Sequence, residues 1–224
     1  MTSRQVQLSS ADEHQFEGYL AEPDQPAKGA IVVIQEIFGV NAHIREVCDG
    51  YATEGYRALA PALFDRVKPG IELGYGGSDM MQGVEIARGK LRVNETLLDI
   101  QAAIDYLNGD HKTGLVGYCF GGLMSWLASC ELAGIECAVS YYGGGVSGEL
   151  DRPAKVPVLF HFGRLDAHIP MAEVNAVAEA CLDSDVHVYE ADHGFNCNHR
   201  ASFDAAAADL ALSRSLEFFA AHLG

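Results

Sequence analysis

Short apolar runs alternate along this chain with longer segments in which apolar residues recur at helical spacing. Residues 30–34 are all apolar and mostly β-branched, a composition typical of a strand buried on both faces of a sheet. The segment after them, about 42–54, places Ile44, Val47 and Tyr51 on one helical face. Repetition of this strand-then-helix pattern predicts a doubly wound, mostly parallel α/β sheet flanked by helices.

The same pattern, read along the whole sequence, predicts one domain over residues 1–224. Residues 62–77 are irregular and rich in glycine and proline, which indicates a loop over the top of the sheet. A long helical segment follows at about 78–108, with a break expected near Gly89. Strands are expected at 6–8, 16–20, 30–34, 57–60, 113–116, 136–142, 156–161 and 186–189, and helices at about 42–54, 78–108, 123–132, 171–181 and 201–221.

The segment Gly117-Tyr118-Cys119-Phe120-Gly121 has the form of a nucleophile elbow with cysteine in place of serine. An apolar run precedes it and a helical run follows it, which is the strand–turn–helix setting that such a turn requires. The flanking glycines avoid clashes with the neighbouring strand and helix. A cysteine at a helix N-terminus is favoured as a thiolate. Cys119 is therefore the candidate nucleophile.

An acid and a histidine follow the elbow in the chain order of the α/β-hydrolase fold. Asp166 comes just past one predicted strand and His193 just past the last. Taken alone, Asp166 could be a turn former or helix cap, and His193 a loop histidine without a role. Asp192 is a competing acid, but it adjoins His193 in sequence, which makes a hydrogen bond to that imidazole harder. A Cys119–His193–Asp166 triad is the favoured interpretation.

Composition narrows the classes of partner. The formal net charge of −16 argues against nucleic acid and anionic membrane surfaces as partners. No signal-peptide pattern and no membrane-length apolar run is visible. The six cysteines have no C-x-x-C pair, so we expect free thiols and a cytoplasmic location. His193, Cys197 and His199 have no standard metal spacing, and neither a metal nor a cofactor is expected.

Four motifs together give a family resemblance over nearly the whole chain. They are Gln35-Glu36-Ile37-Phe38-Gly39-Val40-Asn41, Gly117-Tyr118-Cys119-Phe120-Gly121-Gly122, Tyr141-Tyr142-Gly143 and His193-Gly194-Phe195. With them the chain resembles the dienelactone hydrolase family, which implies an α/β-hydrolase fold and a Cys–His–Asp hydrolase of lactones or activated esters acting through an acyl-enzyme.

The resemblance also implies roles for residues near the triad. Glu36 matches a buried carboxylate that touches the resting thiol, and a nearby negative charge would keep that thiol neutral until substrate arrives. The oxyanion hole would be the backbone N–H groups of Phe120 and Ile37. Tyr141 matches a family tyrosine near the site, although a core or rim tyrosine is the alternative. The expected pocket residues are Tyr141, Phe38, Arg88 and Cys197.

The chain departs from the family at the substrate carboxylate. Two arginines hold that carboxylate in the family's best-known members, and neither is present at the matching segments, about 79–83 and 195–198. Arg88, Arg164 and Arg200 are candidates to replace them, and each could instead be a solvated surface charge. We therefore expect a small-molecule ester or lactone substrate that need not be a dienelactone.

Two functions from different classes are consistent with these residues. The first is a lactone or ester hydrolase, favoured as a monomer. The alternative is a protein on the same fold that binds a small molecule without turnover or senses oxidants through the Cys119 thiol.

Overall fold

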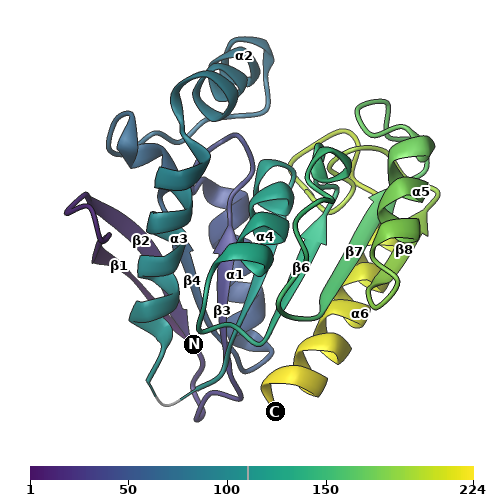
Figure 1. The fold of residues 1–224 in the computed structure, drawn as a ribbon. Helices are drawn as coiled ribbons and strands as arrows, with labels where there is room; N and C mark the ends of the chain where they lie inside the picture. Colours follow the sequence, from purple (N-terminus) through teal and green to yellow (C-terminus); the bar gives the residue numbers. More distant parts are fainter. Residues whose placement is uncertain (110) are drawn as a thin grey trace.

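The computed structural model describes residues 1–109 and 111–224 and contains one eight-stranded sheet (Figure 1). The strands are β1 (Thr2–Ser9), β2 (Gln15–Glu22), β3 (Ala30–Ile34), β4 (Arg57–Pro61), β5 (Thr113–Tyr118), β6 (Cys137–Tyr141), β7 (Val158–Gly163) and β8 (Asp185–Tyr189). Their order in the sheet is β1-β2-β4-β3-β5-β6-β7-β8. The β1–β2 hairpin joins β4 in antiparallel fashion, and the strands from β4 to β8 are parallel.

Helices cover both faces of this sheet, as the α/β-hydrolase fold requires. Figure 1 shows α3, α4 and α5 over one face and α1 and α6 over the other. The helices are α1 (Ala42–Thr53), α2 (Gly77–Glu85), α3 (Val93–Leu107), α4 (Phe120–Glu131), α5 (Met171–Ala180) and α6 (Ala205–Leu223). The expected fold class and layering are confirmed.

Three predicted helices differ from the structure by three residues or more. The helix expected at 123–132 is α4, which begins at Phe120. The long helix expected at 78–108 is divided into α2, a π turn over Ile86–Lys90 and α3, because Leu91 and Arg92 are extended. The last helix was expected from 201 but begins at 205. Its N-cap Asp204 accepts a hydrogen bond from the Ala207 amide at 2.9 Å, which ends the preceding loop.

The central strands explain why the carboxyl ends of the sheet carry the side chains of interest. Every residue of β3, β5 and β6 is buried, so these strands have no solvated face on which to place polar groups. Polar side chains that reach a site must then come from the loops beyond the strand ends, where parallel strands of one sheet deliver them together. α2 lies above that end of the sheet (Figure 1).

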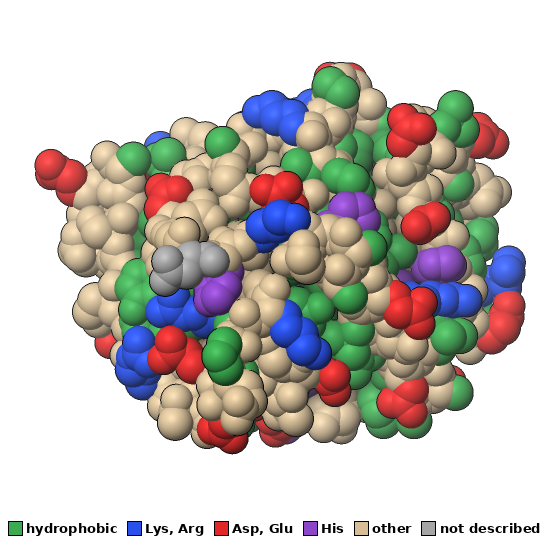
Figure 2. Space-filling model, turned by 90° about the horizontal axis from the view of Figure 1, so that it is seen from below, with side chains coloured by type: hydrophobic (Ala, Val, Ile, Leu, Met, Phe, Trp, Pro, Cys, Tyr) green, Lys and Arg blue, Asp and Glu red, His purple; other side chains and the backbone are tan. Residues whose placement is uncertain are grey.

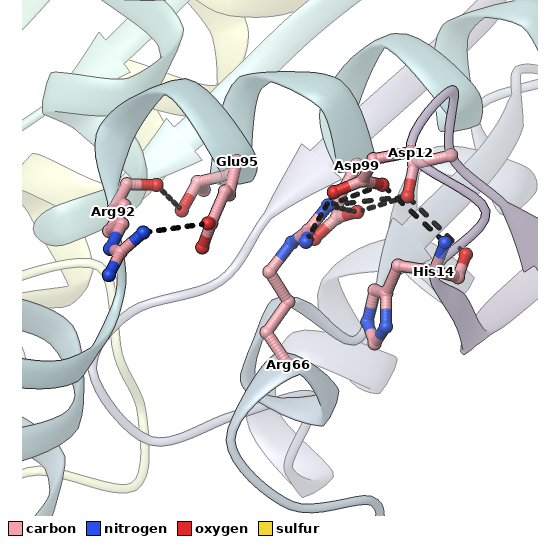
Figure 3. A network of polar contacts seen from close by, with 8 residues as sticks. Asp12, His14, Arg66, Arg92, Glu95 and Asp99 are labelled. Carbon is pink, nitrogen blue, oxygen red and sulfur yellow. Dashed lines mark hydrogen bonds and ion pairs between the residues drawn. The ribbon is translucent and has the colours of Figure 1, made fainter.

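A buried ion-pair network fastens the β1–β2 hairpin to α3 (Figure 3). Arg66 donates hydrogen bonds from Nε and Nη2 to the Asp99 carboxylate at 2.6 and 2.7 Å, and from Nη1 to Asp12 at 2.8 Å. Ser10 donates a further bond to Asp99 at 2.8 Å. The Asp99 side chain is only 1% exposed, so its negative charge depends on these partners.

Charged side chains of both signs lie on the face of the molecule opposite α2. Figure 2 views the molecule from below, at the end opposite α2, and shows acidic and basic side chains interspersed. Over the described part of the chain, none of the helices is both long enough and apolar enough to cross a bilayer.

The Arg66 network generates a stability prediction. Arg66→Met leaves the Asp99 carboxylate buried without its cation, so we expect the free energy of unfolding to fall by about 3 kcal/mol. Denaturant unfolding followed by circular dichroism measures it. The matched control is Arg152→Met, since Arg152 pairs with Glu131 at 42% exposure of each side chain. That variant should lose less than about 1 kcal/mol, and equal losses would contradict a special role for Arg66.

Candidate active site

The turn between β5 and α4 holds Cys119 in a strained conformation, with φ of 55° and ψ of −112°. Close packing around the turn leaves no space for a side chain at its three glycines. A Cβ on Gly117 would lie 1.9 Å from the Gly121 carbonyl oxygen, and one on Gly121 would lie 2.3 Å from that of Ile34. One on Gly122 would lie 2.6 Å from the Tyr141 carbonyl oxygen. Side chains at these glycines would push the helix off the sheet.

His193 links Cys119 to Asp166. His193 Nε2 lies 3.2 Å from the Cys119 Sγ, and His193 Nδ1 donates to Asp166 Oδ2 at 2.7 Å. The other oxygen of Asp166 accepts a hydrogen bond from the His168 amide at 2.8 Å. Because the carboxylate can only accept, it fixes the proton on Nδ1 and turns Nε2 toward the sulfur.

Adjacent parallel strands deliver the side chains of this site. Glu36 follows β3, Cys119 follows β5, and Tyr142 follows β6, while Asp166 and His193 follow β7 and β8. Residues that are far apart in sequence thus meet at the carboxyl end of the sheet, which is the usual location of sites in such folds.

The contacts of His193 with Asp166 and Cys119 favour the charged form of the imidazole. Burial lowers the pKa of His193, but the hydrogen bonds to Asp166 and Cys119 outweigh it and raise that pKa to about 10. Burial likewise acts to raise the pKa of Asp166, and its bond to His193 reverses the effect and holds that pKa below the ordinary value. A positive imidazole at this position stabilises negative charge on the neighbouring sulfur.

Glu36 pairs with Arg200 beside the triad. The Arg200 Nη1 lies 3.4 Å from Glu36 Oε1, and its guanidinium lies over the rings of Phe38 and Tyr75. Burial raises the pKa of Glu36 despite the positive charges of Arg200 and His193. The family resemblance implied a contact between Glu36 and the thiol, whereas among the described residues the sulfur's hydrogen-bond partner is His193.

The residues whose backbone amides are expected to form an oxyanion hole pack in a small apolar cluster. Phe120 is the first residue of α4, where helix amides have no partner within the helix. Ile37 and Phe120 belong to the same cluster, which also contains Phe38, Phe64 and Ile86. α2 covers it closely, since a Cβ on Gly83 would lie 2.1 Å from the Ile37 carbonyl oxygen. An apolar cover of this kind shields the site from water.

The tyrosine beside the triad is Tyr142, which corrects the expectation for Tyr141. Tyr141 is fully buried in the core, where its hydroxyl is 2.8 Å from that of Ser215. Tyr142 adopts a positive φ of 37°, and its ring centroid lies 5.1 Å from that of His193. Its buried hydroxyl has no hydrogen-bond partner among the described residues. Tyr142 lies just past the end of β6, where its positive φ departs from strand geometry, and the sequence alone does not say which tyrosine faces the site.

Of the remaining residues expected to line the pocket, some lie near the triad and others are exposed on the surface. Phe38 lies under Arg200, but Arg88 is exposed on the π turn. Arg164 is also exposed and pairs with Glu190, so Arg200 is the arginine that reaches the triad region. Cys197 is fully buried, and burial raises its pKa to about 11.

Two groups of side chains carry atoms that could bind a metal ion, and they share His43. Glu36, His43 and Cys197 form one group, and His43, Glu46 and His199 form another, each with its ligand atoms within 4.8 Å of one another. His193, Cys197 and His199, which were considered together in the sequence, therefore do not form one of these groups. His43 went unnoticed in the sequence because it lies on α1, far from Cys197 along the chain.

The family comparison covers nearly the whole chain. The model of the dienelactone hydrolase family matches residues 16–223. A candidate carboxymethylenebutenolidase of Synechocystis sp. is 36% identical over 234 aligned positions, covering 93% of both chains. The carboxymethylenebutenolidase of Pseudomonas putida is 32% identical over 230 positions, covering 98% of this chain and 97% of that protein.

Solved structures agree with the sequence comparison. The crystal structure of a candidate dienelactone hydrolase from Klebsiella pneumoniae matches with a TM-score of 0.83 and 27% identity, covering 98% of this chain and 99% of that one. A dienelactone hydrolase-like promiscuous phosphotriesterase from metagenomic libraries, at 21% identity and a TM-score of 0.77, shares the fold.

The His193 contacts generate a pH prediction. In an NMR titration the His193 imidazole should lose its proton near pH 10, and Asp166→Asn or Cys119→Ala should lower that pKa because each removes a partner of the charged ring. Since the folded pKa exceeds the ordinary 6.5, the pairing stabilises the fold fully below about pH 6.5 and progressively less as the pH rises toward 10. His193→Gln identifies the resonance. A His193 that titrates near 6.5 in all proteins would contradict the ion pair.

Proposed function

This chain belongs to the dienelactone hydrolase family, a family of carboxylic-ester and lactone hydrolases, and we propose that it cleaves its substrate by covalent catalysis at Cys119. The observation that supports this most strongly is the continuous contact of Cys119 with His193 at 3.2 Å and of His193 with Asp166 at 2.7 Å. A nucleophile, a base and an orienting acid in this arrangement are the parts that acyl transfer needs.

In the acylation step the Cys119 sulfur attacks the carbonyl carbon, and the carbonyl π electrons move to its oxygen. The Phe120 and Ile37 amides would stabilise that oxyanion. When the tetrahedral intermediate collapses, the carbon–oxygen bond to the leaving group breaks, and protonated His193 gives its proton to the departing oxygen. The products are a thioester on Cys119 and a neutral imidazole.

Deacylation reverses the role of His193. The neutral imidazole takes a proton from water, which attacks the thioester carbonyl, and the second tetrahedral intermediate expels the sulfur. Asp166 keeps the ring oriented in both steps and stabilises the imidazolium that forms again. In a lactone the alcohol or enol oxygen stays tethered to the acyl group, so water must displace the sulfur before the product can leave.

Arg200 supports a preference for substrates that carry a negative charge. Its side chain is 15% exposed and already lies 3.4 Å from the Glu36 carboxylate. A substrate carboxylate at the mouth of the site could share this guanidinium, which has donors for more than one oxygen. The proposed substrates are therefore lactones or activated esters with a nearby carboxylate.

Cys119→Ala tests the nucleophile. Removal of the sulfur eliminates the acyl-enzyme, so we expect kcat/KM for an activated aryl ester to fall about 10³-fold or more. The matched control is Cys181→Ala, because Cys181 is a half-buried thiol just past α5. That variant should retain wild-type rates.

Other outcomes of this experiment would remove the proposal. Wild-type esterase activity in Cys119→Ala would place the chemistry elsewhere. If the wild-type protein hydrolyses none of a panel of lactones and esters while mild peroxide selectively oxidises Cys119, the redox-sensing function is favoured instead.

Arg200→Gln tests the charge preference. A carboxylate-bearing ester should show a KM increase of about tenfold, the scale of one charge-assisted hydrogen bond, while an uncharged ester of the same leaving group changes less than about twofold. Steady-state kinetics on the pair of esters gives the comparison. Arg164→Gln is the control, because Arg164 pairs with Glu190 at an exposed position. Equal losses for both esters would show that Arg200 acts by holding Glu36 and not by binding substrate.

A further inference from the structure

The group formed by Glu36, His43 and Cys197 takes no part in the proposed hydrolysis apart from the contact of Glu36 with Arg200. The three side chains come from the loop after β3, from α1 and from the loop after β8. Their exposures are 1%, 3% and 0%, and their ligand atoms lie within 4.8 Å of one another. Buried polar groups in such a cluster require partners.

The hydrogen bonds of His43 fix which ring nitrogen faces the group. Its Nδ1 lies 3.1 Å from Asn198 Oδ1, and the amide nitrogen of Asn198 donates to Glu46 at 3.4 Å. Asn198 therefore presents its oxygen to His43, and Nδ1 carries the proton. The lone pair of Nε2 is left buried, and this atom has no hydrogen-bond partner among the residues that the structure describes.

Glu36 has a similarly unpartnered atom. Its Oε1 faces Arg200, whereas its Oε2 is buried and has no hydrogen-bond partner within residues 1–109 and 111–224. Two buried polar atoms without a hydrogen-bond partner, next to a buried thiol, are costly in an apolar surrounding. A cation would satisfy both acceptors at once.

The donor atoms match the preferences of one class of ion. An imidazole nitrogen, a thiolate sulfur and a carboxylate oxygen are the ligands that zinc takes in proteins. Zinc ligands at about 2.0–2.3 Å in a tetrahedron lie roughly 3.3–3.8 Å apart, so pairs of ligand atoms would approach by up to about 1.5 Å. The Asn198–Glu46 pair behind His43 is an outer shell of the kind that orients metal-binding histidines.

We propose that Glu36 Oε2, His43 Nε2 and Cys197 Sγ form a binding site for Zn²⁺ next to the nucleophile, with a fourth position for water. Binding forms the zinc–sulfur bond and releases to solvent the Cys197 proton, together with any proton held by Glu36, and the two anionic ligands neutralise the ion. Arg200 keeps its contact with Glu36 Oε1, so the ion uses the other oxygen. Zinc would bind here whether or not Cys119 turns over a substrate.

The test measures metal binding in a protein without the catalytic thiol. In the Cys119→Ala background, Co²⁺ should give the charge-transfer absorption of a cobalt–thiolate bond, and Zn²⁺ should displace it. Competition with a chromophoric chelator gives the Zn²⁺ affinity. Adding Cys197→Ser, which is nearly isosteric, should abolish the absorption and weaken Zn²⁺ binding at least about tenfold. Adding His43→Phe should weaken it to a similar extent.

Controls separate this site from other thiols. Adding Cys181→Ala to the same background should leave both signals unchanged. Zn²⁺ should also raise the melting temperature of Cys119→Ala but not that of Cys119→Ala/Cys197→Ser, because the ion binds only the folded site. The proposal is overturned if the absorption survives without Cys197, if it disappears without Cys181, or if micromolar Zn²⁺ does not bind to Cys119→Ala.

Discussion

The close packing of the turn at Cys119 against β3 and β6 is the constraint on which the site depends. Carbonyl oxygens of Ile34 and Tyr141 occupy the space that side chains at Gly121 and Gly122 would need. The backbone at Cys119 is therefore held at a positive φ, a strained conformation for any residue with a Cβ. The burial of the surrounding strands supplies the free energy that maintains this strain and directs the sulfur toward the carboxyl end of the sheet.

The charge arrangement follows from the same geometry. A single imidazole lies between one buried carboxylate, Asp166, and the sulfur, and a second buried carboxylate, Glu36, is balanced by Arg200. The two acids are kept apart by the strand order, since β5 and β6 separate β3 from β7. This separation lets one acid act on the histidine while the other pairs with Arg200 and, as proposed, binds a metal ion.

Much of the fold was predictable from the sequence, because buried runs such as 30–34 and the glycines of the 117–122 turn admit few structures. The order of Cys119, Asp166 and His193 likewise suggested the contacts that the structure contains. Side-chain direction was not predictable. The choice between Tyr141 and Tyr142 depends on the local φ at the strand end, and the approach of His43 to Cys197 depends on how α1 packs.

Trapping of the acyl-enzyme tests the central claim most directly. A slowly deacylating aryl ester is mixed with the wild-type protein, the reaction is quenched in acid, and the digest is analysed by mass spectrometry. The account predicts one acyl group on the peptide that contains Cys119, formed at the rate of the leaving-group burst, and no such group after His193→Ala at the same time point. Turnover with the acyl group on a different residue, or with a burst but an unmodified Cys119, would contradict it.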